Sequence, residues 1–326
     1  MARSEELTFR AGEIELAGTM TLPGDPPPAD RNGRYPNVLL LPGWLPRDRD
    51  GAYDRAAHPS WFGHGPMGIA EGRLLARLAE ALASDGVASL RYDKRGCGAS
   101  GDSWTDADLF TLIDDARDAL GAMRSRRDLD LRRTGIVGHG EGATLALSVA
   151  IADPAVGALT LIGASARSGR DVLRRGVAER TRRGVDRDHP LVAGLDRFAE
   201  ELIERAARRE ERMTLSLPGG ELVPLSLAYW EQWFHTPAIA LATMLHRSVT
   251  LVHGEADVFS DPSESRLLAA ALEGGGNRPR LVELAGIGHH LAEADAATVR
   301  SLAADLVARL QPRELPPVLL AIEEMG

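Results

Sequence analysis

The stretch Ile136-Val137-Gly138-His139-Gly140-Glu141-Gly142-Ala143 lies where an apolar strand is expected to turn sharply into a helix. Small residues around a central position, in the pattern G-x-S-x-G, let such a turn lift the central side chain above the sheet, and the turn is called a nucleophile elbow. Residues 134–137 supply the strand and residues 141–152 the helix. Gly140 stands where the serine is expected, so the sequence predicts an intact turn without its nucleophile.

Strands and helices alternate on both sides of this turn. Residues 38–41 are an apolar run typical of a strand buried on both faces, and residues 71–84 carry apolar side chains at helical spacing. Further elements are expected at residues 7–22 (antiparallel strands), 87–92, 106–125, 158–162, 249–253, 262–272, 280–284 and 293–310. Such an alternation indicates an α/β fold in which a mostly parallel sheet is covered by helices on both faces.

The alternation is interrupted once, between residues 164 and 246. This segment is rich in arginine and acidic residues and contains an amphipathic helix through residues 195–206. We therefore expect a core formed by residues 1–163 and 247–326, with a mainly helical cap inserted at residues 164–246.

Composition excludes several classes of protein. The 326 residues have a net charge of −9, which removes the electrostatic attraction that dominates nucleic-acid binding. Acidic residues follow the first methionine, and no run of about 20 apolar residues is present, so we expect a soluble, cytoplasmic protein without a membrane partner. Cys97 is the single cysteine, which excludes an internal disulfide and a cysteine-cluster metal site. Lys94 is the only lysine among 38 basic residues, a bias that we attribute to a GC-rich genome.

Five motifs together resemble the α/β-hydrolase family, and within it the capped bacterial serine esterases and peptidase-like hydrolases. The first is the Leu-Pro-Gly-Trp loop with its Asp-Arg-Asp-Gly continuation (residues 41–51), and the second is the turn after the next strand (residues 90–100). The others are the elbow (residues 138–142), an acid-bearing loop (residues 253–257) and a histidine loop (residues 286–289). The resemblance covers nearly the whole chain. Gly140 is the one departure from the elbow motif of this group.

The resemblance implies a role for each motif. In this fold the catalytic residues follow the chain order nucleophile, acid, base, which Gly140, Asp257 and His289 fit. Asp257 would orient the imidazole of His289 and stabilise its protonated form. The backbone N–H groups of Glu141 and Trp44 would form the oxyanion hole. No cofactor or metal is implied.

Other histidines and the cysteine are weaker candidates for a role in the site. His290 is the alternative to His289 as the base, and His139 is expected to pack beneath the active site. His58 and His64 could bind a metal, but no carboxylates stand at matching ligand spacing. Cys97 lies on the wrong loop for a papain-like nucleophile.

Two further segments have an open interpretation. The aromatic residues Tyr229, Trp230, Trp233 and Phe234 either form the apolar lid of a pocket for a small-molecule substrate or pack the cap on the core. The apolar residues 315–322 are too few to span a membrane. We expect them to pack on the core or against a second chain in a homodimer.

Three functions are consistent with an elbow that lacks serine. The first is hydrolysis of an ester or acyl group, either as an engineered or natural nucleophile-deleted variant or with water activated directly by His289. The second is a lyase reaction, in which His289 removes a proton next to a carbonyl and a carboxylate leaves. The third is a non-catalytic ligand-binding protein. A lyase would explain why the base, the acid and the oxyanion donors are present without serine. We expect hydrolysis first and elimination second.

Overall fold

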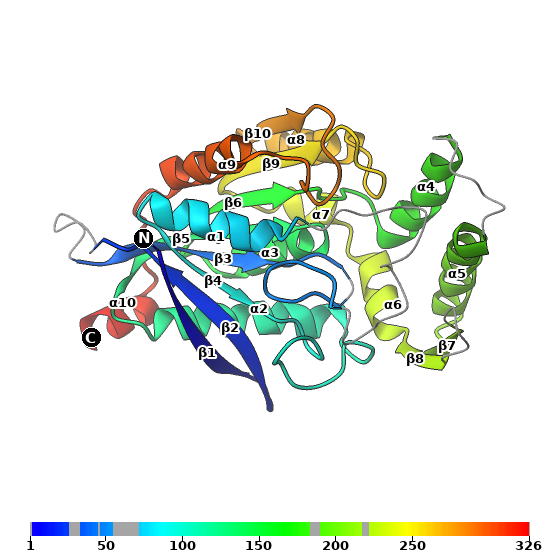
Figure 1. Ribbon diagram of the computed structural model, residues 1–326, viewed down its shortest axis with the longest axis horizontal. Coiled ribbons are helices and arrows are strands. Elements are labelled where there is room, and N and C mark those ends of the chain that lie inside the picture. Colours follow the sequence, from blue (N-terminus) through cyan, green and yellow to red (C-terminus); the bar gives the residue numbers. More distant parts are fainter. Residues whose placement is uncertain are drawn as a thin grey trace.

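In the computed structural model, which describes residues 2–25, 33–44, 46–54, 72–182, 190–216 and 222–325, an eight-stranded sheet runs through the middle of the molecule (Figure 1). Its strands are Arg3–Ala11 (β1), Ile14–Leu22 (β2), Tyr35–Leu41 (β3), Ala88–Tyr92 (β4), Leu129–His139 (β5), Val156–Ile162 (β6), Ser248–Gly254 (β9) and Arg280–Leu284 (β10). The order across the sheet is β1-β2-β4-β3-β5-β6-β9-β10. Only β2 is antiparallel to its neighbours; the other pairs are parallel.

Helices cover both faces of this sheet, which confirms the predicted fold class. They are Leu74–Ser84 (α1), Leu109–Arg124 (α2), Glu141–Ala152 (α3), Ser263–Gly274 (α8) and Ala296–Arg309 (α9). Helices α1 and α9 contact each other on one face, whereas α2 and α3 contact each other on the other.

The central strand β3 shows why the apolar run at residues 38–41 predicted a fully buried strand. Val38 and Leu40 pack with α1 and α9, whereas Leu39 and Leu41 pack with α2 and α3, and all four are completely buried. Side chains of a strand alternate between the two faces. An uninterrupted apolar run is therefore needed where helices cover both of them.

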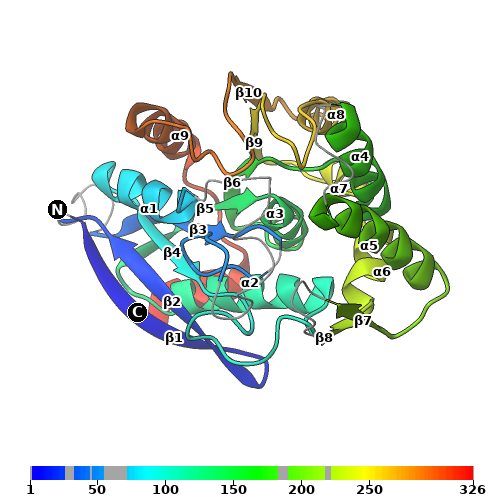
Figure 2. The same ribbon diagram turned by 45° about the vertical axis from the view of Figure 1, so that its right-hand side comes forward.

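Residues 164–246 form a group of elements at one end of the sheet (Figures 1 and 2). They comprise the helices Gly169–Arg182 (α4), Pro190–Ala207 (α5), Ala228–His235 (α6) and Ala238–Ala242 (α7) and the strands Arg212–Ser216 (β7) and Leu222–Ser226 (β8). Strands β7 and β8 pair only with each other, so the described part of this segment adds no strand to the large sheet. This hairpin was not predicted, although the buried Val223 and Leu225 alternate with exposed neighbours.

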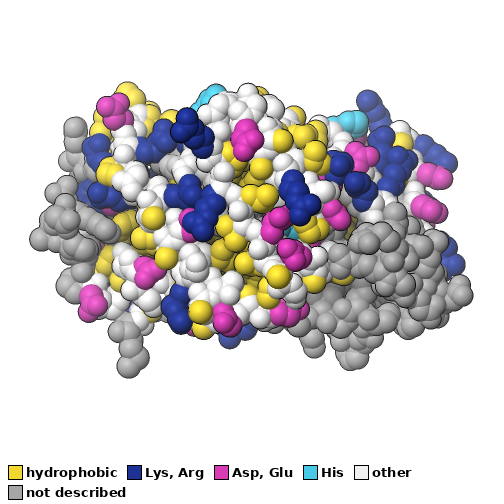
Figure 3. Space-filling model, turned by 90° about the horizontal axis from the view of Figure 1, so that it is seen from above, with side chains coloured by type: hydrophobic (Ala, Val, Ile, Leu, Met, Phe, Trp, Pro, Cys, Tyr) yellow, Lys and Arg dark blue, Asp and Glu magenta, His cyan; other side chains and the backbone are white. Residues whose placement is uncertain are grey.

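The C-terminal helix α10 (Pro317–Met325) packs on the core. Leu315 and Leu319 are buried against Leu131 and Ala155, while Val318 faces outward. No helix in the described ranges is long and apolar enough to cross a membrane. On the face seen in Figure 3, acidic, basic and apolar side chains are intermixed.

The turn from β5 to α3 depends on the absence of side chains at two positions. A Cβ atom at Gly138 would lie 2.2 Å from the carbonyl oxygen of Gly142, and a Cβ at Gly142 would lie 2.5 Å from that of Leu41. Real Cβ atoms do not approach backbone oxygens so closely. The backbones of β3, β5 and α3 can therefore meet at the turn only with glycine at positions 138 and 142.

We expect Gly138→Ala to lower the free energy of unfolding by about 1–3 kcal/mol, because the new methyl group overpacks a rigid backbone contact. Gly121→Ala is the matched control, since a Cβ at this exposed position of α2 meets no atom within 4 Å. That variant should gain about 0.5–1 kcal/mol from helix propensity. Urea unfolding measures both, and equal stability of the two variants would contradict the account.

Candidate active site

Gly140 occupies the tip of the turn, between the end of β5 and the start of α3. Its φ and ψ angles are 55° and −113°, and its N–H donates to the carbonyl oxygen of Ile162 at 2.8 Å. A positive φ with this ψ is strained for any residue that has a Cβ, by about 1–3 kcal/mol. Glycine therefore relieves strain that a serine at the same position would carry.

Asp257 and His289 come from neighbouring parallel strands. Asp257 follows β9 and His289 follows β10, so both lie beyond the carboxyl ends of the strands, on the same edge of the sheet as Gly140. The expected hydrogen bond is present, with His289 Nδ1 2.6 Å from Asp257 Oδ2. The opposite ring atom, Nε2, lies 3.2 Å from the point where a Cβ at position 140 would stand.

The carboxylate of Asp257 is completely buried and surrounded by donors. Its Oδ1 accepts the backbone N–H groups of Phe259 and Ser260 at 2.8 and 2.9 Å. Its Oδ2 faces His289 and, at 3.3 Å, His253 Nε2. Burial by itself raises the pKa of this carboxyl, but the two histidines outweigh burial and hold the pKa well below its usual range. The carboxylate therefore remains ionised and can stabilise a protonated His289.

His253 is the first residue of the acid-bearing motif (residues 253–257), and no role was predicted for it, yet it helps to hold Asp257. It is fully buried, and its ring nitrogens lie 2.6 Å from Ser265 Oγ and 2.7 Å from the Ser260 carbonyl oxygen. Burial lowers its pKa, but the hydrogen bond and charge of Asp257 outweigh burial, so the pKa of His253 is raised. Its position, four residues before Asp257, was the available signal.

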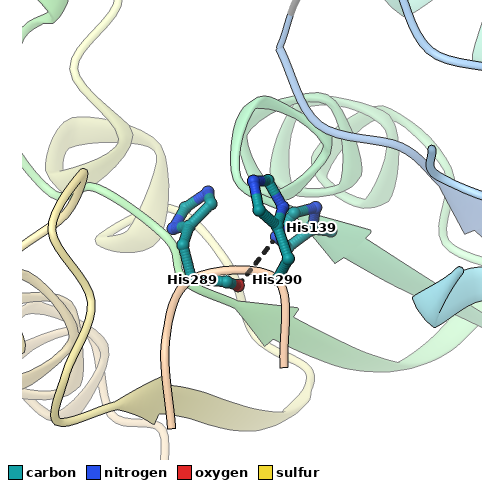
Figure 4. Close-up of side chains that lie close together, drawn as sticks. All are labelled: His139, His289 and His290. Atoms are coloured by element: carbon teal, nitrogen blue, oxygen red, sulfur yellow. Dashed lines mark hydrogen bonds between the residues drawn. The ribbon is translucent and has the colours of Figure 1, made fainter. Parts of the chain in front are cut away.

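Three imidazole rings lie close together at this edge of the sheet (Figure 4). His139 Nε2 lies 3.0 Å from the carbonyl oxygen of His289, and the rings of His139 and His290 pack against that of His289. The ring that lies 2.6 Å from Asp257 Oδ2 is that of His289, and burial lowers the pKa of His290 far below the ordinary value. Neither histidine replaces His289 beside Asp257.

The same three histidines are a potential ligand set for a metal ion. One nitrogen from each lies within 4.8 Å of the other two, whereas bonds of about 2.0–2.1 Å to a tetrahedral zinc ion place ligand nitrogens about 3.3 Å apart. The rings would have to move closer to share an ion. His58 and His64, considered above as metal ligands, lie outside the described residues.

Lys94 joins the two segments expected to form the oxyanion hole. Its ammonium group lies 2.5 Å from Glu141 Oε2 and donates to the carbonyl oxygen of Gly43 at 3.3 Å. The lysine and the glutamate are both buried. This buried ion pair ties the loop before Trp44 to the start of α3. Lys94 is the only lysine of the chain, and this could have indicated a special role, but we attributed it to a GC-rich genome.

The aromatic residues of α6 meet Trp44. The rings of Trp230 and Trp233 lie 5.1 and 6.5 Å from that of Trp44. Tyr229, Trp230 and Phe234 are buried, and Trp233 is half-buried. These side chains therefore pack residues 164–246 against the loop after β3.

A cavity of about 40 Å³ lies between these elements. Its walls are Trp44, Lys94, Arg95, Trp104, Thr105, Ala107, Leu112, Glu141, Leu225, Ser226, Tyr229 and Trp230. Of the four aromatic residues predicted to bind substrate, Tyr229 and Trp230 line this cavity, while Trp233 and Phe234 do not. Both residues predicted to donate to an oxyanion, Trp44 and Glu141, also line it.

Comparison with known structures agrees with this architecture. Est1E from Butyrivibrio proteoclasticus is 15% identical, with a TM-score of 0.58 over 93% of this chain and 99% of the other. Alpha/beta hydrolase domain-containing protein 10 from mouse is 18% identical, with a TM-score of 0.59 over 94% and 100%. The chain has the α/β-hydrolase fold. The esterase Pf2001 from Pyrococcus furiosus, 12% identical, gives a TM-score of 0.59 over 94% and 90%.

Sequence comparison is more limited. Residues 66–213 of this α/β-hydrolase-fold chain match the family described as serine aminopeptidase, S33. No curated protein sequence matches the chain significantly. At these identities the structural neighbours establish the fold alone, and the reaction has to be inferred from the residues of the site.

Burial of His139 should make stability depend on pH. Burial and the nearby His289 lower the pKa of His139 to about 3, whereas an unfolded histidine has a pKa of about 6.5. Because the folded value is the lower one, this contribution to stability is complete above about pH 6.5 and is lost as the pH falls towards 3. As the pH falls from about 6 to about 5, protonation of His139 in the unfolded chain should lower the free energy of unfolding by about 1 kcal/mol.

Urea unfolding of the wild type and His139→Asn over this pH range measures that slope. The variant should show a shallower dependence than the wild type. His246→Asn, which changes an exposed histidine, should keep the wild-type slope. An unchanged slope in a folded His139→Asn variant would show that His139 is protonated in the native state.

Proposed function

We propose that this chain hydrolyses carboxylic esters of largely apolar small molecules, with a water molecule in the place of the serine hydroxyl. The observation that carries the proposal is the position of His289. Its Nδ1 is held by Asp257, and its Nε2 lies 3.2 Å from the point where a side chain at Gly140 would begin. A water molecule in that space would hydrogen-bond to Nε2, as a serine hydroxyl would.

The proposed reaction needs no covalent intermediate. Water attacks the ester carbonyl carbon and gives a proton to His289 Nε2, while Asp257 stabilises the resulting imidazolium. The carbonyl oxygen becomes an oxyanion. When the tetrahedral intermediate collapses, the bond to the alcohol oxygen breaks and that oxygen takes the proton back from His289.

Backbone donors support the same reaction. Glu141 is the first residue of α3, and the first N–H groups of a helix have no acceptor within the helix. The N–H of Glu141 and that of Trp44 bind the oxyanion. Neither donor depends on the side chain at position 140, so transition-state stabilisation survives without serine.

Residues 164–246 serve as the cap of this site. Their aromatic residues Trp230 and Trp233 pack against Trp44, and Tyr229 and Trp230 line the cavity beside it. Such walls exclude water from the substrate, which strengthens the electrostatic interactions of the oxyanion donors.

Gly140→Ser should raise kcat for p-nitrophenyl butanoate by at least about 100-fold, because a hydroxyl beside His289 restores covalent acyl transfer. The variant should also react with a fluorophosphonate probe, which intact-protein mass spectrometry detects, whereas the wild type should not. Only the variant should show a burst of p-nitrophenol. Gly140→Ala is the matched control, because it adds the same Cβ and the same backbone strain without a nucleophile.

Two results would contradict the proposal. The first is a folded Gly140→Ser variant that gains neither turnover nor label. The second is wild-type protein that converts an acyloxy-bearing substrate to an alkene without incorporating ¹⁸O from water into the released acid, which would identify a lyase.

A further inference from the structure

Two polar atoms beside the oxyanion residues are buried without a partner. They are Oε1 of Glu141 and the hydroxyl of Tyr229. The hydroxyl lies beside the Glu141 carboxylate without meeting the distance and angle of a hydrogen bond, and neither atom has another partner among the described residues. Glu141 is 7% exposed and Tyr229 is 6% exposed. A buried polar atom left unpaired costs about 1–3 kcal/mol, so an unpaired acceptor and an unpaired hydroxyl at one cavity indicate a place for a ligand.

The charges around the cavity select the kind of ligand. Oε2 of Glu141 is already paired with Lys94, and Arg95 also lines the cavity. An ammonium group would be repelled by these two cations, and a carboxylate would face the carboxylate of Glu141. A neutral hydroxyl avoids both conflicts, because it donates to one oxygen and accepts from another.

Tyr229 supplies the second half of such a site. Burial, together with the nearby carboxylate of Glu141, raises the pKa of Tyr229 well above its ordinary value. Its hydroxyl therefore stays protonated and able to donate. A ligand hydroxyl between the two side chains would donate to Glu141 Oε1 and accept from Tyr229, which would satisfy both atoms.

The size of the cavity limits the group further. A volume of about 40 Å³ holds about three water-sized groups, since one water needs about 10–15 Å³ on this measure. That is room for a hydroxyl with one or two carbon atoms, and it is too little for a sugar or an aromatic ring.

We propose that this cavity binds an aliphatic hydroxyl group of the ester substrate, held between Glu141 and Tyr229. The identity of the ligand as an ester rests on the proposed function. Because Glu141 also begins α3, where its N–H is proposed to bind the oxyanion, the hydroxyl lies within a few bonds of the reacting carbonyl. The substrate class is therefore esters of short hydroxy acids, and Tyr229 and Glu141 determine the specificity.

The test compares p-nitrophenyl 3-hydroxybutanoate with p-nitrophenyl butanoate. We expect the wild type to favour the hydroxylated ester about 10-fold or more in kcat/KM, because the plain ester leaves the two polar atoms unpaired. In Tyr229→Phe the ratio should fall towards one. Tyr35→Phe is the matched control, because its hydroxyl bonds to the Asp25 carbonyl oxygen away from the site, and it should keep the wild-type ratio.

A binding measurement separates this inference from the proposed function. The anilides N-(4-nitrophenyl)-3-hydroxybutanamide and N-(4-nitrophenyl)butanamide resist hydrolysis, and their nitrophenyl group quenches tryptophan fluorescence. Trp44, Trp104 and Trp230 line the cavity and report binding. We expect the hydroxylated anilide to bind about 10-fold more tightly to the wild type, and the preference to be lost in Tyr229→Phe.

Each outcome decides one question. A hydroxyl preference in binding, without hydrolysis of either ester, supports the hydroxyl site and contradicts the proposed hydrolase. Hydrolysis of both esters with equal kcat/KM, and equal binding of both anilides, overturns the hydroxyl site and assigns the cavity to water alone. If Tyr229→Phe does not fold, p-nitrophenyl 3-methoxybutanoate tests the site in the wild type. It lacks the donor proton, and a rate equal to that of the hydroxy ester overturns the proposal.

Discussion

The close approach of three backbones at the turn after β5 is the constraint on which the site depends. Gly138 and Gly142 let β5 and α3 come within reach of Leu41 at the end of β3. That contact places the tip of the turn, Gly140, against the imidazole of His289. It also directs the first N–H groups of α3 and the side chain of Glu141 towards the loop that carries Trp44. A larger residue at either glycine would displace all of these groups together.

Buried charge is the second element of the site, and it occurs in two separate places. Asp257 is compensated by two backbone N–H groups and two histidines. Glu141 is compensated by Lys94 on one oxygen only. The fully satisfied carboxylate is suited to a fixed role, the orientation of His289. The carboxylate of Glu141, with one oxygen unpaired, is suited to binding a ligand reversibly.

Much of the fold was predictable from the sequence because its signals are local. Alternating apolar segments predicted the parallel sheet and its helices, and the ends of α1 and α2 fall within three residues of the expected limits. Strand β5 begins at Leu129, five residues before the predicted strand. Its first residues were not predicted to be in the strand because several of them are charged. The hairpin of β7 and β8 was missed because neither strand is an apolar run: β7 contains Arg212, Thr214 and Ser216, and β8 contains Pro224.

The site was predictable only in part. The family motifs brought Gly140, Asp257 and His289 to attention, because each sits in a recognisable loop. Lys94 was not given a role, since its importance comes from contacts between segments far apart in the sequence. His253 was not given a role either, although it stands only four residues before Asp257. The cavity could not be predicted from the sequence either, because its walls bring Thr105 and Leu225 together with Glu141. Residues 105, 141 and 225 share no sequence pattern.

The most direct test of the account compares ester hydrolysis by the wild type and by His289→Ala. The central claim is that His289, held by Asp257, activates water beside Gly140. We therefore predict that kcat/KM for p-nitrophenyl butanoate falls about 100-fold or more in the variant, while the free energy of unfolding changes little. His246→Ala, which alters an exposed histidine, should hydrolyse the ester at the wild-type rate. Hydrolysis by a folded His289→Ala variant at the wild-type rate would contradict the account.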